Sequence, residues 1–394
     1  MINACFGGAS LKLGLHVREE ADDWHVSQLV VRLETRRERE GVELGGVQVE
    51  DDERRDFRLG GVEERVSAAS ELHGDVQMLS RPANIERGSF ARGDLTGDRL
   101  AGVEIAGRAS RLVVATYNIR YAVGSHLIGG SLLRRVGLSR PGRRAQFVGD
   151  NIAKAARILS DGARMPRADI VALQEADRGT IRAGGQHVAR GLAEALRMSY
   201  VRAGTPTPSD VEPKPRRWWL DFEERIRLGE EGDTGVAILS RLPLRDAARI
   251  ELPWSECPWR PRLALAATVP FAGRRLHVFN AHIDTHASVE GQLEQHRGVL
   301  ARADIVSDGE PVVLLGDFNT LTRRARDAAR RLLEAHGYAT PMPTDTCTWR
   351  AGPLRYHFDW IFVRGARVLR WGVAHVRGVS DHWPVWAEIE PERA

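Results

Sequence analysis

From residue 111 onward the chain is a succession of short apolar runs, each ending in a polar side chain. The run LVVATY (112–117) ends at Asn118, and the run IVAL (170–173) ends at Gln174 and Glu175. Runs of this length, bounded by turn residues, are typical of buried strands. Polar residues that point out of strand ends can meet in one crevice although they lie far apart in the sequence. This pattern predicts a strand-rich fold with a polar site at the ends of its strands.

The same pattern predicts further strands and a small number of helices. Strands are expected at 235–240, 262–270, 275–281, 311–315, 357–363, 368–376 and 384–389, and helices at about 147–161, 186–197, 288–302 and 322–336. The dipeptide Ala272-Gly273 predicts a hairpin between two of these strands. Many strands, few helices and hairpin connections favour a layered α+β sandwich over a doubly wound parallel sheet.

Residues 1–110 have a different texture. They contain no Tyr and a single Trp, Trp24, and charged blocks alternate with phrases rich in Gly, Val and Glu. Few large apolar side chains are present to offset the entropy of ordering. We expect a poorly structured N-terminal extension, or upstream sequence included by a misplaced start, followed by a folded domain over 111–394. A regulatory or partner-binding domain is the alternative.

Charge is distributed unevenly between these two parts. Residues 1–110 hold 15 Lys and Arg against 21 Asp and Glu, whereas the remainder holds 42 against 32. A basic second part favours a phosphate-bearing partner, although GC-rich coding also produces an excess of Arg over Lys. No apolar run is long enough for a membrane span. The three widely spaced cysteines fit a reducing cytoplasm, and we expect a cytoplasmic monomer.

The strand-end residues carry the chemistry that a phosphodiester requires. They are Asn118, Glu175, Asn280, His282, Asp317, Asn319, Asp359, Asp381 and His382. A hard divalent cation prefers carboxylate and amide oxygens, and Mg²⁺ takes one or two carboxylates. An attacking water needs a carboxylate that orients it, and the charge that develops on phosphorus needs donors such as His and Asn.

Seven phrases occur in order, namely TYNI, LQEAD, GVAILSRLP, NAHID, GDFN, FDWIF and SDHWP. In this order they resemble the endonuclease/exonuclease/phosphatase superfamily, which includes the DNase I-like nucleases. The resemblance covers about residues 111–392. It implies a four-layer α/β-sandwich of two packed mixed sheets flanked by helices. It also implies a phosphoesterase that depends on Mg²⁺, with Mn²⁺ as the alternative.

The resemblance further implies a role for each residue that matches a family motif. Glu175 binds the metal with Asn118 beside it, and Asp381 lies close to the metal. Asp317 orients or deprotonates the attacking water, Asn319 contacts the phosphate, His282 assists the leaving group, and Asp359 orients His382 on the scissile phosphate. We add Arg120 and Asn280 as expected substrate contacts.

Positions at which the sequence departs from the motifs of some family members indicate which branch of the superfamily it resembles. Asn118 is followed by Ile119 and Arg120, and a His stands at position 282; both features count against an apurinic-site endonuclease. The sequence is closest in style to the bacterial sphingomyelinase- and deadenylase-like branch. The expected substrate is a phosphodiester, in a nucleic acid or in a phospholipid head group. A catalytically silent protein that binds a phosphate ligand is the alternative.

Two further segments offer substrate contacts. The loop 121–144 carries five arginines, and the phrase KPRRWW (214–219) places Arg beside Trp. A solvated insertion and a local hydrophobic cluster are their respective alternatives.

Overall fold

The computed structural model describes residues 2–6, 9–20, 23–35, 85–88, 110–124, 143–205, 232–253 and 262–392. The chain divides into two units, Met1–Val76 and Gln77–Ala394. The first unit contains an antiparallel sheet of β1 (Ile2–Phe6), β2 (Ala9–Glu20) and β3 (Asp23–Thr35). The division of the chain at residue 110 stays a prediction.

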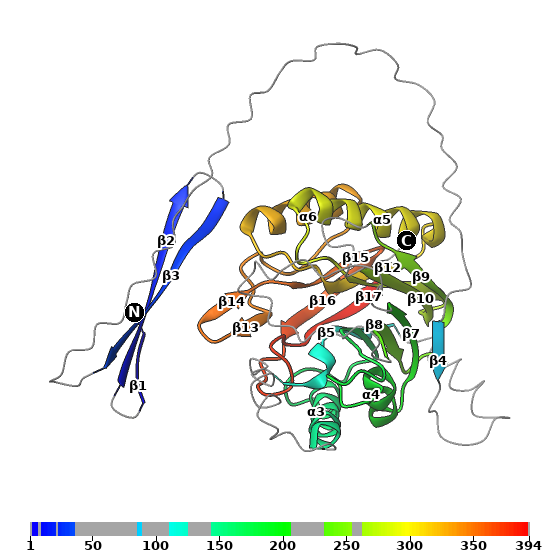
Figure 1. Cartoon of the computed structure of the whole chain (residues 1–394). Coiled ribbons are helices and arrows are strands. Elements are labelled where there is room, and N and C mark those ends of the chain that lie inside the picture. Colours follow the sequence, from blue (N-terminus) through cyan, green and yellow to red (C-terminus); the bar gives the residue numbers. More distant parts are fainter. Residues whose placement is uncertain are drawn as a thin grey trace, which may run out of the picture. The chain divides into compact units, whose positions relative to one another are not determined.

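The second unit is built on two mixed sheets (Figure 1). The larger sheet has the order β16-β17-β5-β6-β8-β7-β4, and the smaller has the order β15-β12-β11-β10-β9. In the larger sheet the strands are β4 (Ile85–Gly88), β5 (Leu112–Asn118), β6 (Ile170–Gln174), β7 (Ser199–Thr205), β8 (Thr234–Ser240), β16 (Ala366–Val373) and β17 (Val385–Pro391). In the smaller sheet they are β9 (Arg245–Glu251), β10 (Leu263–Phe271), β11 (Arg274–His282), β12 (Val312–Asp317) and β15 (Asp359–Arg364). A short hairpin, β13 (Trp349–Ala351) and β14 (Leu354–Tyr356), stands beside them.

Helices cover the outer face of each sheet, so the described part of this unit has four layers (Figure 1). The helices α3 (Arg143–Ser160) and α4 (Val188–Leu196) pack on the larger sheet. The helices α5 (Val289–Ser307) and α6 (Arg323–Ala335) pack on the smaller one. Both of the latter begin at a hydroxyl side chain: Ser288 accepts from Gly291 N, and Thr322 accepts from Ala325 N. Such caps satisfy backbone donors that would otherwise lack a partner at a helix start.

Side-chain alternation creates the layer between the sheets. Successive strand residues point to opposite faces, so every second residue of β5, β6, β11, β12 and β15 enters the inter-sheet core. Leu112 and Val114 of β5 lie in that core, as do Val313 and Leu315 of β12. Continuing the same parity leads to Asn118 and to Asp317. The polar residues therefore lie where the apolar layer between the sheets ends.

The structure confirms the expected sandwich of two mixed sheets with flanking helices. The strands β10 and β11 form the expected hairpin about Ala272-Gly273. Three strands of the two mixed sheets, β4, β7 and β9, were not anticipated, nor was the hairpin of β13 and β14. The sequence of β9, RDAARIE, is mostly charged because β9 is an edge strand with partly exposed side chains. In β7, Arg202 is buried because it pairs with Asp233.

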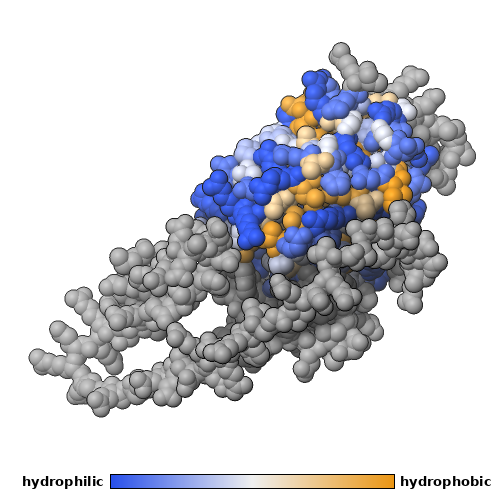
Figure 2. Space-filling view, turned by 90° about the horizontal axis from the view of Figure 1, so that it is seen from above, coloured by the Kyte–Doolittle hydropathy of each residue, from blue (hydrophilic) through white to orange (hydrophobic). Residues whose placement is uncertain are grey.

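The surface of this unit is largely hydrophilic where Figure 2 shows it, on the side of the α5–α6 layer, with smaller hydrophobic areas between the polar ones. None of the helices that the structure describes combines the length and the apolar character needed to cross a membrane.

Candidate active site

Three expected catalytic residues form one row across the smaller sheet. His282 at the end of β11 is the register partner of Asp317 at the end of β12. Asp317 is in turn the register partner of Asp359 at the start of β15. Because β12 runs parallel to β11 and antiparallel to β15, two strand ends and one strand start meet at the same edge of the sheet. Register alone thus places an imidazole and two carboxylates side by side.

Gly316 makes this row possible. Its φ is +149°, and a Cβ at this position would lie 1.9 Å from the carbonyl oxygen of Ala281 on the neighbouring strand. Only glycine fits so close an approach of two backbones. The glycine of the phrase GDFN is therefore required by the packing of β12 against β11 next to Asp317.

Asp317 is the centre of the site. Its Oδ2 accepts a hydrogen bond of 2.9 Å from Nδ2 of Asn118, and its Oδ1 accepts one from the backbone N of Asn319. The Nε2 atoms of His282 and of His382 each lie 3.7 Å from Oδ2 of Asp317. Burial raises the pKa of Asp317 to about 6, against the opposing effect of the His382 charge. The carboxylate is thus ionised at neutral pH and more basic than an ordinary aspartate.

His382 is oriented by Asp359. Its Nδ1 lies 2.9 Å from Oδ2 of Asp359, which leaves Nε2 directed towards Asp317. Burial alone would lower the pKa of His382, but the carboxylates of Asp359 and Asp317 outweigh it and raise the pKa to about 10. Before any ligand binds, His382 is therefore a cation that presents one N–H into the site.

The backbone of Asp359 is itself held by a hydrogen bond to a side chain. The hydroxyl of Thr348 accepts from the backbone N of Asp359 and from that of Phe358, at 3.0 Å each. The Oδ1 atom of Asp359 is buried and has no hydrogen-bond partner among the described residues. The carboxylate is consequently committed through one oxygen to His382.

His282 lies on the opposite side of Asp317. Atom NH1 of Arg262 is 3.0 Å from both ring nitrogens of His282. A guanidinium has only donors, so it keeps an imidazole nitrogen in contact with it in the accepting form. The two imidazoles that flank Asp317 are thus held differently, His382 by a carboxylate and His282 by a guanidinium.

Glu175 and Asp381 lie at the mouth of the site. They are 8% and 9% exposed, whereas Asn118 and Asp317 are each 1% exposed. Glu175 directly follows β6, and its φ of 52° is left-handed, which is uncommon for a residue with a side chain. Such strain is frequent at functional sites. The register pairs Asn118 with Gln174 across β5 and β6, so Glu175 emerges one residue beyond Asn118.

Arg120 belongs to the same mouth. It lies in the 3₁₀ turn η1 (Arg120–Ala122), where all three residues have positive φ. Its NH1 is 3.2 Å from Oδ2 of Asp381. Burial opposes the charge of this guanidinium, but Asp381 and, to a lesser extent, Glu175 raise its pKa. Arg120 therefore stays positive beside the two acids.

A buried ion pair packs against the 3₁₀ turn η1. Arg182 donates to both carboxylate oxygens of Asp177, at 2.6 and 2.9 Å, and its guanidinium lies 4.0 Å from the ring centroid of Tyr121. The backbone N of Tyr121 donates to the carbonyl oxygen of Glu175. The turn that carries Arg120 and the backbone of Glu175 are thus fixed together.

Two groups of residues could form a cation site. Among the described residues, ligand atoms of Asp317, Asp359 and His382 lie within 4.8 Å of one another. In that group Oδ2 of Asp359 and Nδ1 of His382 are already hydrogen-bonded to each other. Glu175 and Asp381 at the mouth of the site, with the deeper amide of Asn118, offer the oxygen donors that Mg²⁺ prefers. These residues fit a hard divalent cation.

One expected substrate contact has all its polar groups engaged by the protein. Asn280 is fully buried between the sheets, where its Nδ2 donates to the carbonyl oxygens of Leu173 and Ala237, and its Oδ1 accepts from Gln174. With every polar group engaged, Asn280 joins the two sheets and has nothing left for a substrate. We therefore remove Asn280 from the expected substrate contacts.

Asn319 is partly committed in the same way. Its Nδ2 donates to the carbonyl oxygen of Ile283 at 2.8 Å, and its φ is 50°. Its backbone N is bound to Asp317. Asn319 thus fixes the turn after β12, and only its side-chain oxygen remains to meet a substrate.

Three residues that orient the catalytic groups were missed. Ser380 donates to the carbonyl oxygen of Asn118 and accepts from the backbone N of His382. Thr348 holds Asp359, and Arg262 holds His282. Ser380 stands next to Asp381 in the sequence and could have been found there. Nothing in the sequence around Thr348 or Arg262 signals their roles, since these depend on contacts between distant segments.

Some expected contacts lie outside the described residues. These are residues 125–142 of the Arg-rich loop and the segment 214–219.

Comparison with known proteins identifies the family. The model of the Endonuclease/Exonuclease/phosphatase family matches residues 115–382. The uncharacterized protein YbhP of Escherichia coli K12 is 29% identical over 243 residues, which cover 59% of this chain and 87% of that protein.

Solved structures resemble the fold. An endonuclease/exonuclease/phosphatase from Beutenbergia cavernae superposes with a TM-score of 0.50 at 22% identity, covering 72% of each chain. The catalytic domain of human Nocturnin, solved with a bound sulfate anion, gives a TM-score of 0.46 at 16% identity, covering 72% of this chain and 95% of that one. The family match spans more than half of the chain and includes Asn118, Glu175, His282, Asp317, Asp359 and His382. The protein therefore belongs to the Endonuclease/Exonuclease/phosphatase family of phosphoester hydrolases, with the DNase I-like fold.

Proposed function

We propose that the protein is a phosphodiesterase that depends on a divalent cation, with Mg²⁺ as the first candidate and Mn²⁺ as the alternative. One observation carries this proposal. The carboxylate of Asp317, held by Asn118, stands 3.7 Å from each of two imidazoles, and one of these is oriented by a second acid. Hydrolysis of a phosphodiester needs a base for water and donors for the phosphate oxygens, and this arrangement supplies both.

Asp317 acts as the base. Its raised pKa, about 6, lies close to neutral pH, where a carboxylate is both ionised and able to take a proton. The amide of Asn118 keeps one of its oxygens in place. A water hydrogen-bonded to this carboxylate would be directed at a phosphorus atom bound between the two histidines.

His382 and His282 act on the phosphate. The protonated His382 donates from Nε2 to a non-bridging oxygen, and Asp359 keeps the ring in that orientation. His282 lies on the other side of Asp317 and is placed to stabilise the leaving oxygen. Arg120 at the mouth adds a donor for the substrate phosphate.

The cation would be held by Glu175, with Asn118 and Asp381 beside it. When bound, such a cation acts as a Lewis acid that stabilises charge on the phosphate oxygens. Glu175 and Asp381 supply the negative charge that attracts it, and the guanidinium of Arg120 offsets part of that charge. These assignments stay proposals for each residue, as do the sphingomyelinase-like branch, the monomeric state and the cytoplasmic location.

A generic phosphodiester tests the function. Bis(p-nitrophenyl) phosphate should be hydrolysed with Mg²⁺ or Mn²⁺ and not with a chelator. Glu175→Gln should lower the rate at saturating cation by about a hundredfold or more, and Mg²⁺ should no longer raise the melting temperature. Glu334→Gln, on the outer face of α6, is the matched control and should behave as the parent. Lack of turnover in the parent, together with lack of any melting shift with Mg²⁺ or Mn²⁺, would instead favour the catalytically silent binder.

A further inference from the structure

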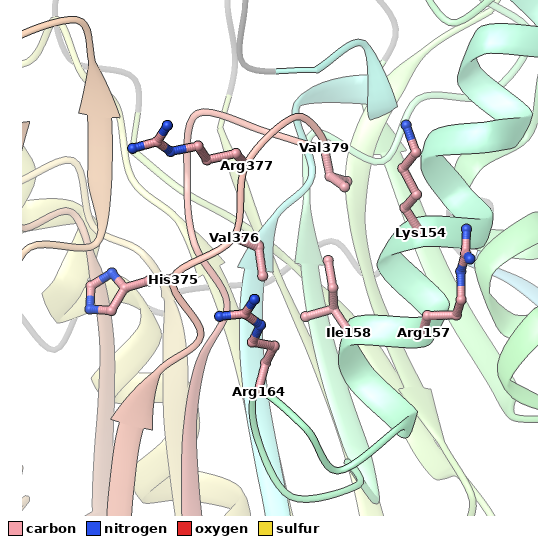
Figure 3. Close-up of a pocket in the computed structure, with 8 residues that line it drawn as sticks. All are labelled: Lys154, Arg157, Ile158, Arg164, His375, Val376, Arg377 and Val379. Atoms are coloured by element: carbon pink, nitrogen blue, oxygen red, sulfur yellow. The ribbon is translucent and has the colours of Figure 1, made fainter.

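A basic groove lies beside the site, and none of the residues assigned to catalysis lines it. It has a volume of about 680 Å³. It lies between α3 and the segment that leads from β16 to His382 (Figure 3). Its lining residues are Lys154, Arg157, Ile158, Arg164, His375, Val376, Arg377 and Val379. We call it the α3 groove.

The α3 groove concentrates positive charge on both of its walls. Lys154 and Arg157 come from α3, Arg164 follows the helix, and Arg377 stands on the opposite wall (Figure 3). All four side chains are exposed, and none forms an ion pair with another residue in the described part of the chain. Most exposed arginines of α5 and the larger sheet do have such partners, for example Arg297 with Glu290 and Arg367 with Glu390. Asp150 and Asp161 are the exposed acids of the same segment, and neither forms an ion pair with these four side chains. Four exposed cations around one hollow attract an anion.

The groove is continuous with the catalytic loop. Val379, which lines it, directly precedes Ser380, Asp381 and His382. The carbonyl oxygen of Val379 accepts from the backbone N of Gly124, and the carbonyl oxygen of Gly124 accepts from Arg120. A strand of phosphates that leaves the site past Arg120 would therefore meet the α3 groove next.

An exposed aromatic ring lies on the same face of α3 as Lys154. Phe147 of α3 is 47% exposed, and it precedes Lys154 by seven residues, so both lie on one face of the helix about 10 Å apart along its axis. A Cβ at Gly124 would lie 3.5 Å from Cζ of Phe147, so the ring stands beside the segment that joins groove and site. Aromatic rings next to cations are the elements with which proteins hold single-stranded nucleic acids.

The surroundings favour a nucleic-acid strand over a lipid surface. The apolar side chains of the groove are Ile158, Val376 and Val379, which are half-buried or buried in its floor. The exposed groups at its edges are cations. A membrane-binding surface would expose several aliphatic and aromatic side chains for insertion between lipids, whereas Phe147 is the only exposed large hydrophobic side chain among the described residues of α3.

We propose that the α3 groove binds the phosphate backbone of a single-stranded nucleic acid, so that the strand extends from the active site along α3. Lys154, Arg157, Arg164 and Arg377 hold the phosphates, and Phe147 offers a surface on which a base stacks. This inference rests on the proposed function for the identity of the reaction, but the binding itself does not require turnover.

A charge reversal on α3 tests the groove. Lys154→Glu combined with Arg157→Glu should weaken binding of a fluorescein-labelled oligothymidylate by about tenfold or more, measured by anisotropy in chelator. The slope of log Kd against log salt should fall by about 0.7 for each phosphate that the variant no longer neutralises. Hydrolysis of bis(p-nitrophenyl) phosphate, which is too small to span the groove, should stay at the parent level. The matched control is Arg324→Glu with Arg331→Glu, the same charge change on the exposed face of α6.

The outcomes separate the groove from the reaction. Equal affinity of the groove variant and the α6 control for the oligonucleotide would overturn the proposal. The proposal would also be overturned if the groove variant lost binding to vesicles of phosphatidylglycerol and phosphatidylcholine but bound the oligonucleotide as tightly as the parent. If the parent hydrolyses no phosphodiester, the proposed function fails, while the anisotropy measurement still decides the groove. Arg377→Glu, on the opposite wall of the groove, should also weaken binding of the oligonucleotide if both walls belong to one site.

Discussion

Asn118 and Asp317 belong to different sheets, and Nδ2 of Asn118 donates a hydrogen bond of 2.9 Å to Oδ2 of Asp317. This bond spans the end of the apolar layer between the sheets. Both residues continue the inward-facing parity of their strands, β5 and β12. The carboxylate proposed as the catalytic base is thus oriented by the packing of one sheet on the other, and the activity should be sensitive to that packing.

Asp317→Asn removes the proposed base while keeping the shape of the side chain. We expect hydrolysis of a generic phosphodiester to fall by about 10² to 10⁴-fold, with the melting temperature unchanged or higher, because a buried charge is lost. Steady-state kinetics and a thermal melt check this. A variant that keeps the parent rate would show that another group takes the proton.

Asp359→Asn should act through His382. Loss of the carboxylate removes the main cause of the raised pKa of His382 and frees its ring to turn. We expect a fall in kcat of about 10 to 100-fold, the usual cost of removing a group that orients a catalytic one. The double variant with His382→Gln should lose little more than His382→Gln alone. Additive losses would mean that the two residues act independently.

Gly316→Ala should destabilise the fold strongly. The added Cβ would lie 1.9 Å from the carbonyl oxygen of Ala281, so β11 and β12 must separate. We expect a loss of roughly 3 kcal/mol or more in the free energy of unfolding, measured by denaturant titration. Gly273→Ala is the control: its φ is also positive, but nothing lies within 4 Å of the added Cβ, so its cost should be about 1 kcal/mol. Equal costs for the two variants would contradict the close approach.

His296 should make stability depend on pH. It is fully buried against Phe318, neither ring nitrogen has a hydrogen-bond partner among the described residues, and burial lowers its pKa to about 3. A lowered pKa means that the unfolded chain binds the proton more readily. The contribution is therefore complete above pH 6.5 and is lost as the pH falls towards 3, by up to about 1.4 kcal/mol per pH unit. Melts of His296→Leu between pH 7 and 5 should show a shallower decline than the parent, and an unchanged decline would rule out this source.

The strand β4 should belong to the catalytic domain. Glu86 accepts from the hydroxyl of Tyr200 at 2.8 Å and lies 2.8 Å from Nε2 of His187, and β4 pairs with β7 over four residues. A chain that begins at residue 77 should melt at the temperature of the full chain. One that begins at residue 111 should melt several degrees lower, because it leaves the edge of β7 unpaired. Equal melting of both would return the boundary to residue 110.

The sequence by itself determined which strands carry the site and which residues end them. The apolar runs of β5, β12 and β15 and the polar residues at their ends are local features of the sequence. Both faces of these strands are buried, so the inward parity of Asn118, Asp317 and Asp359 is known only from the structure. The positions of the expected helices and of the hairpin at Ala272-Gly273 follow from local signals in the same way. The ordered motifs then identified the family.

Only the tertiary structure decided how these residues are held. Asn280 matched a strand-end pattern, yet it is fully buried between the two sheets and joins them by hydrogen bonds. Its burial depends on the position of the opposite sheet, which the local sequence does not specify. Arg262 and Thr348 orient His282 and Asp359 from segments that no local pattern connects to them. The α3 groove arises because a helix and a distant loop pack side by side, so that unpaired cations spread along the chain surround one hollow. Hydrogen bonds and charges act over a few ångströms in space, and separation in sequence does not report that distance.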